Sequence, residues 1–108
     1  DVRIVTPHIP DKWYVHMVTR SNYRHLVANG VKIYEYTPGF IHAKQMVADD
    51  EIGVIGTVNM DYRSYYMHHE CGVLLYKTDS FNSVWALIGK LLIKNKLNTK
   101  PINTFIFI

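Results

Sequence analysis

A histidine, a lysine, a hydroxyl and an amide stand within one short segment: His42, Lys44, Thr57 and Asn59. A neutral imidazole is a good nucleophile toward phosphorus and titrates at about pH 7. The lysine supplies a point charge, and the hydroxyl and the amide supply hydrogen-bond donors. Donors of this kind stabilise the negative charge that phosphoryl oxygens carry during attack. These residue types together indicate attack on a phosphodiester.

Two predicted strands bring these side chains together. Residues 41–49 and residues 52–58 both read as strands, joined by a tight acidic turn. Alternate residues of a strand share a face, so His42 and Lys44 point the same way, as do the hydroxyl and the amide. We therefore expect a hairpin that places the second pair of side chains beside the first.

The spacing of these residues, H-x-K-x4-D followed by G-T-x-N, resembles the signature of the phospholipase D superfamily. The run GFIHAKQMVADDEIGVIGTVNMDYRSYYMHHE, over residues 39–70, is most similar to the C-terminal catalytic half of bacterial cardiolipin synthases. The resemblance covers roughly residues 1–78. It implies an α/β fold in which a layered mixed β-sheet is flanked by helices. That fold would be one phospholipase D-like lobe, with its single HKD motif at residues 42–59.

The resemblance also implies roles for individual residues. It gives six catalytic positions, which are His42, Lys44, Asp49, Thr57, Asn59 and Glu70. Glu70 would orient His42 by bonding its other ring nitrogen, whereas Asp49 would be structural rather than reactive. Substrate-binding residues are expected at Lys44, Asn59, Arg63 and Ser64. A structural ion pair with a nearby aspartate explains the arginine equally well.

The implied activity is that of a phosphatidyltransferase of cardiolipin synthase type. Such an enzyme converts two phosphatidylglycerol molecules into cardiolipin and glycerol through a phosphohistidine intermediate. The family pattern needs two motif copies, and this sequence holds one. The chain would then be one catalytic half, with the second HKD half supplied by the same full-length chain or by a homodimer mate. His42, in the C-terminal copy, is expected to be the general acid and base.

Two alternatives stay open. The chain could be a phospholipase D-like phosphodiesterase or nuclease that acts as a homodimer, because water can replace the alcohol acceptor. It could also be an inactive isolated fragment. The run GTVNMDYRS argues against a nuclease, so nucleic acid is not an expected partner.

Composition agrees with a phospholipid substrate and a membrane surface as partners. The net charge is +3, which favours anionic partners without distinguishing among them. Cys71 is the single cysteine, so the sequence suggests neither an intrachain disulfide nor a metal cluster. The pattern needs no metal or other cofactor, because lysines would supply the positive charge. No run of about 18 apolar residues predicts a transmembrane helix. The expected location is the bacterial cell membrane, on a face that the sequence does not define.

The remaining elements alternate in type, which predicts an α/β sheet. The expected strands span residues 2–6, 31–36 and 71–76, the last apolar enough to be central, and the expected helices span residues 12–28 and 80–95. Asp11 is a plausible N-cap for the first helix, and Gly30 suits a left-handed cap at its end. We assign residues 1–80 to the catalytic domain and residues 81–108 to a C-terminal helix and apolar tail of uncertain role. The final TFIFI would be an exposed, aggregation-prone edge if it were unpaired.

Overall fold

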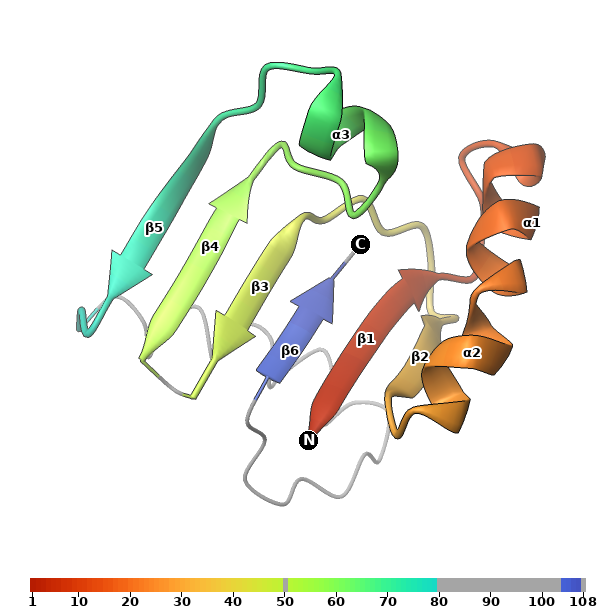
Figure 1. The fold of residues 1–108 in the computed structure, drawn as a ribbon, viewed down its shortest axis with the longest axis horizontal. Coiled ribbons are helices and arrows are strands. Elements are labelled where there is room, and N and C mark those ends of the chain that lie inside the picture. The colour runs from red at the N-terminus through yellow and green to blue at the C-terminus, as the bar shows by residue number, and fades with distance from the viewer. Residues whose placement is uncertain (50, 80–103, 108) are drawn as a thin grey trace.

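A computed structural model describes residues 1–49, 51–79 and 104–107. Within these residues the strands form one six-stranded sheet in the order β2-β1-β6-β3-β4-β5 (Figure 1). Parallel and antiparallel pairs both occur, so the expected mixed sheet of an α/β fold is confirmed. The elements are β1 (Val2–Pro7), α1 (Trp13–Ser21), α2 (Tyr23–Ala28), β2 (Lys32–Tyr36), β3 (Gln45–Ala48), β4 (Ile52–Gly56), α3 (Tyr62–Tyr66), β5 (Gly72–Tyr76) and β6 (Thr104–Phe107).

The strand expected over residues 2–6 is confirmed as β1, and most of its residues are buried. Ile4, Val5 and Thr6 of β1 are buried, and β1 pairs in parallel with β2. A parallel pair needs a crossover connection, which α1 and α2 provide on one side of the sheet (Figure 1). The hydroxyl of Thr6 lies 2.7 Å from the phenol oxygen of Tyr23, which fixes the start of α2 against β1.

The single helix expected over residues 12–28 is instead two helices that meet at Asn22. Short polar side chains compete there for backbone carbonyls: Ser21 Oγ donates to Val18 O at 2.7 Å, and Asn22 Nδ2 donates to the same oxygen at 3.0 Å. Such bonds draw acceptors away from the helical ladder, which accounts for the break. Gly30 has a φ of 85°, so the predicted left-handed position is confirmed.

The predicted cap of the first helix is wrong. The N-cap residue of α1 is Lys12, in an extended conformation and with no side-chain capping bond. The carboxylate of Asp11 is therefore not used to satisfy the backbone N–H groups at the start of the helix.

The predicted hairpin is confirmed, with a shorter first strand. β3 and β4 pair antiparallel, with Gln45 opposite Ile55 and Ala48 opposite Ile52. Residues 41–44 precede β3 and are not strand, although Gly56 N still donates to Lys44 O at 3.1 Å. This last bond joins the segment before β3 to the end of β4.

Two features of the following segment differ from expectation. The sequence indicated no helix at residues 62–66, yet α3 forms there because Asp61 Oδ1 accepts a hydrogen bond from Ser64 N at 2.7 Å. β5 was expected to be central, but among the described strands it lies at the edge of the sheet beside β4. Its apolar side chains Val73 and Leu74 are exposed.

The tail strand is paired on both sides in the described sheet. β6 lies between β1 and β3, parallel to the first and antiparallel to the second. Residues 104–107 of the TFIFI segment therefore do not form the exposed edge that was expected only if the segment were unpaired. The helix expected over residues 80–95 lies outside the described residues. Within the described part of the chain, no helix is long and apolar enough to span a membrane.

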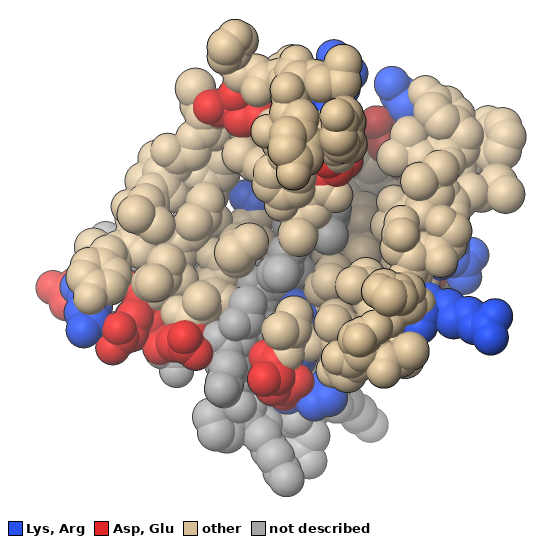
Figure 2. All heavy atoms as spheres, in the orientation of Figure 1, with Lys and Arg blue, Asp and Glu red and all other residues tan. Residues whose placement is uncertain are grey.

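Charge is unevenly distributed along the chain. Residues 12–34 contain no acidic residue, and their cations are Lys12, Arg20, Arg24 and Lys32. Figure 2 shows basic side chains beside α1 and α2, and acidic ones gathered at the opposite lower corner, where the β3–β4 turn lies in Figure 1. The two helices therefore present the more cationic side of this view.

Candidate active site

The histidine and the lysine of the motif contact each other directly. Lys44 Nζ lies 2.7 Å from His42 Nε2. A protonated lysine only donates, so Nε2 of His42 accepts this bond and the ring proton lies on Nδ1. The imidazole is exposed and stacks on Phe40, with ring centroids 6.4 Å apart. The nitrogen lone pair that would react is thus held by the lysine until another acceptor takes the ammonium.

Asp49 lies at the far end of the hairpin from this pair. It follows β3 in the turn and has a φ of 53°, which few residues other than glycine and asparagine or aspartate adopt readily. Lys44, by contrast, is joined through its carbonyl to Gly56 at the other end of the two strands. This position fits a structural role for Asp49 in the turn.

Thr57 and Glu70 form a second cluster, at the end of β4. The hydroxyl of Thr57 donates to Glu70 Oε2, and Ser64 Oγ donates to Glu70 Oε1 at 2.9 Å. These two bonds, the threonine's first, hold the pKa of the Glu70 carboxyl below its ordinary value. Between the same two segments, Cys71 N donates to Thr57 Oγ1 at 3.1 Å and Thr57 N donates to Cys71 O at 2.9 Å. Thr57 is therefore fixed as part of a network around an ionised carboxylate.

Glu70 does not bond His42 in this chain. Its third partner is His68, whose Nδ1 lies 3.1 Å from Glu70 Oε1, and no bond to His42 is found among the described residues. The role of Glu70 in orienting His42 stays a prediction. No motif in the sequence signals the contact that His68 makes.

Ser64 and Arg63 differ in their surroundings although they are neighbours. Ser64 is buried, and its hydroxyl both donates to Glu70 and accepts from Asn59 N at 3.2 Å. Its hydroxyl thus ties the backbone of Asn59 to the carboxylate. Arg63 is exposed and has no carboxylate partner in the part of the chain that the structure describes. Contact of either residue with a headgroup stays a prediction.

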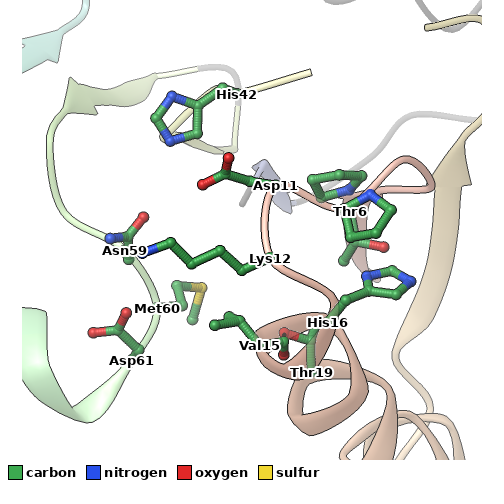
Figure 3. Close-up of a pocket in the computed structure, with 12 residues that line it drawn as sticks. Thr6, Asp11, Lys12, Val15, His16, Thr19, His42, Asn59, Met60 and Asp61 are labelled. Atoms are coloured by element: carbon green, nitrogen blue, oxygen red, sulfur yellow. Dashed lines mark hydrogen bonds between the residues drawn. The ribbon is translucent and has the colours of Figure 1, made fainter. Parts of the chain in front are cut away.

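A groove of about 310 Å³ joins the motif to the first helix (Figure 3). The motif contributes His42 and Asn59, and the next two residues, Met60 and Asp61, also line it. The opposite wall comes from the end of β1, the loop that follows and α1. The sequence had not indicated that this first loop reaches the motif. The sequence feature that could have indicated this wall is the charged pair Asp11-Lys12, which follows two prolines. The same pair also has the pattern of a helix start.

Metal ligands do not gather in the described residues. No group of three or more histidine, cysteine, aspartate or glutamate side chains is placed to hold a metal ion there. Cys71 is exposed and free. The groups that could carry positive charge at the groove are lysine and histidine side chains.

Comparison with known proteins decides the family. The family model described as "Cardiolipin synthase, PLD-like domain" matches residues 1–92. This chain belongs to that family. The matched residues include both the H-x-K and the G-T-x-N segments.

Named relatives agree with this assignment. An uncharacterized protein of Streptococcus mutans is 48% identical over 86 residues, which are 80% of this chain and 19% of the relative. A cardiolipin synthase of Geobacillus sp. (strain WCH70) is 50% identical over 86 residues, or 80% of this chain and 17% of that protein. A cardiolipin synthase of Halalkalibacterium halodurans is 46% identical over 84 residues, or 78% and 17%. The chain therefore spans less than a fifth of the length of these relatives. No solved structure matches at a significant level.

Proposed function

We propose that this cardiolipin synthase-like lobe provides one catalytic half of a phosphatidyltransferase that acts on phosphatidylglycerol. The observation that carries the proposal is the bond between Gly56 N and Lys44 O, which joins the H-x-K segment to the G-T-x-N segment. It keeps the histidine, the lysine and the amide of the motif at one end of the hairpin. The second half would come from the rest of a longer chain or from another copy.

The reaction would proceed in two displacements. One histidine attacks the phosphorus of the first phosphatidylglycerol, a phosphorus–nitrogen bond forms, and glycerol leaves with a proton from the other histidine. The hydroxyl oxygen of the second phosphatidylglycerol then bonds to phosphorus, the phosphorus–nitrogen bond breaks, and the hydroxyl proton returns to that other histidine. The products are cardiolipin and glycerol. We assign the proton-transfer role to His42 and the nucleophilic role to its counterpart in the missing half.

Lys44 and Asn59 would hold the phosphoryl oxygens. In the free chain the lysine donates to His42 Nε2 at 2.7 Å, so a bound phosphate would compete for the same ammonium. When the phosphate takes that donor, Nε2 of His42 is free to take up a proton from solvent, and this is the proton that it then gives to the leaving glycerol. Substrate binding and activation of His42 are thereby coupled through one side chain. The bacterial cell membrane would supply the phosphatidylglycerol.

The decisive test measures cardiolipin formation from labelled phosphatidylglycerol in mixed micelles. The chain is assayed alone and together with a second catalytic half, as wild type, His42→Ala and His69→Ala. His69 is an exposed histidine outside the motif, so its variant controls for loss of a surface imidazole. We expect His42→Ala to lower the rate by about 10²- to 10⁴-fold, the usual contribution of a general acid or base, and His69→Ala to leave it unchanged.

Equal rates for the two variants would contradict the proposal. Trapping a phosphorylated His42 would instead show that it is the nucleophile, and our division of roles between the two histidines would be wrong.

A further inference from the structure

The groove at His42 has a wall that the motif does not account for. It is built by the end of β1, the following loop and one face of α1 (Figure 3). The positions on α1 are three and four residues apart, which places them along a single helix face: Lys12, Val15, His16 and Thr19. Asp11 precedes them and lines the same groove. Every residue of this wall lies 23 or more positions before His42, so the wall is a separate contribution of the fold.

The start of α1 favours an anion. Lys12 is the N-cap residue, no side chain caps the helix, and the first turn contains no acidic residue. The N–H groups at the start of α1 therefore receive no side-chain hydrogen bond, and the nearest acidic residue in sequence is Asp11, one position before the N-cap. The ammonium of Lys12 has no ion-pair partner within the described residues. In Figure 3 its side chain extends toward Asn59, so an unpaired cation reaches across the groove toward the motif.

The carboxylate of Asp11 favours a hydrogen-bond donor over an anion at one end of the groove. Its carboxylate makes no capping bond to α1, and within the described ranges it has no ion-pair partner. Figure 3 shows it drawn between His42 and the backbone at Lys12. A carboxylate accepts hydrogen bonds from hydroxyls and repels phosphate. A ligand that satisfies both residues therefore carries an alcohol close to Asp11 and an anionic group close to the Lys12 ammonium.

The phosphoglycerol headgroup of a second phosphatidylglycerol has this arrangement. Its reacting hydroxyl must reach the phosphorus beside His42, and its own phosphate lies three carbons away. The groove volume of about 310 Å³ is near the lower limit for small-molecule sites, which suits a headgroup without its acyl chains. We propose that Asp11, Lys12 and His16 form the subsite for this acceptor headgroup. Asp11 accepts from the glycerol hydroxyls and Lys12 contacts the phosphate, while the His16 imidazole lines the α1 side of the groove.

This assignment rests on the proposed transferase function, but its first test does not need activity. The isotope-labelled chain is titrated with glycerophosphoglycerol, the water-soluble headgroup, and amide and imidazole shifts are followed by NMR. We expect perturbations at Lys12 and His16 together with His42. Lys12→Gln should weaken binding about tenfold, because it removes a charge-assisted contact. Lys32→Gln removes the same charge from a lysine that pairs with Asp1, outside the groove, and should bind as wild type does.

Two results would overturn the subsite. One is equal headgroup affinity of Lys12→Gln and wild type, and the other is absence of binding to the wild type at tens of millimolar. Heteronuclear spectra of each variant show whether it is folded. If Lys12→Gln is unfolded, Lys12→Arg replaces it; that variant keeps the charge and should retain binding.

A second readout separates this inference from the function on which it rests. In the assembled enzyme, water competes with the acceptor for the phosphatidyl-enzyme and gives phosphatidic acid. Lys12→Gln should lower the ratio of cardiolipin to phosphatidic acid at least severalfold, because both products come from the same phosphatidyl-enzyme. An unchanged ratio with normal glycerol release would refute the subsite alone. No glycerol release from the wild-type enzyme would refute the transferase proposal, and the headgroup titration would still decide the subsite.

Discussion

Replacing Gly56, the glycine of the G-T-x-N segment, tests how closely β4 and β5 approach each other. A Cβ added at Gly56 would lie 2.5 Å from Cys71 O and 2.7 Å from the Cα of Gly72, both backbone atoms of the neighbouring segment. Ordinary contact begins at 3.4 Å, so β4 and β5 would have to separate by close to an ångström. That movement would also stretch the bond from Thr57 N to Cys71 O, now 2.9 Å.

The magnitude follows from three contributions. Overpacking costs about 1–3 kcal/mol, and a weakened backbone hydrogen bond costs up to about 1 kcal/mol. Replacing glycine by alanine restricts the unfolded chain, which offsets about 0.4–1 kcal/mol. We therefore expect Gly56→Ala to lower the free energy of unfolding by about 1.5–3 kcal/mol. Gly72→Ala is the matched control, because its Cβ would meet nothing closer than 3.4 Å and should change stability by less than about 1 kcal/mol.

Urea unfolding followed by circular dichroism measures both variants. With a slope of about 1–3 kcal/mol per molar urea, Gly56→Ala should unfold at a midpoint lower by about 0.5–3 M. Equal midpoints for Gly56→Ala and Gly72→Ala would show that β4 and β5 can separate at little cost, and the close-approach argument would fail. If Gly72→Ala is recovered folded and Gly56→Ala is recovered only unfolded, the close-approach argument is supported.

Three further predictions use the same unfolding assay. Asp61→Ala should lose about 1 kcal/mol because it removes the cap of α3, whereas Asp61→Asn keeps a capping oxygen and should lose little; equal losses would contradict the capping role. Gly30→Ala should lose about 1 kcal/mol because of its φ of 85°, and Gly39→Ala, where a Cβ has open space, should not. The hydrogen bond with His8 holds the pKa of Glu35 below its usual 4.5, so its stabilisation is complete above about pH 4.5 and is lost as the pH falls through the lower folded-state value. The acid-side decline in urea midpoint should therefore be steeper for wild type than for Glu35→Gln, and parallel pH profiles would refute it.

Local spacing predicted the hairpin well, because strand alternation and turn geometry are set by neighbouring residues. His42, Lys44 and Asn59 came from such spacing, and the bond between Lys44 and Gly56 joins their two segments as expected. The extent of the first strand was less predictable. Residues 41–44 have a strand-like sequence, but pairing beyond Gln45 depends on which strand lies on the other side.

The second wall of the groove was not predictable from the same rules. Asp11 has the residue type and position of a helix cap, and only the three-dimensional packing shows that its carboxylate lines the groove instead. The helix α3 could have been found from the aspartate at position 61 with a serine three residues later, a capping pattern that the sequence did contain. The positions of β5 and β6 depend on pairing between distant segments, which single-sequence patterns do not encode.

The place of β6 has a consequence for how this sheet assembles. In the described sheet β6 alone joins the β1–β2 pair to the β3–β4–β5 group, and Val2 pairs with Thr104. Local hairpin contacts can form early, but the two groups cannot be united until a strand from the far end of the sequence has arrived. Closing so long a loop is slow, and meanwhile β1 and β3 each expose an open edge. Removing residues 104–107 should therefore promote intermolecular strand pairing and aggregation before it changes either group internally.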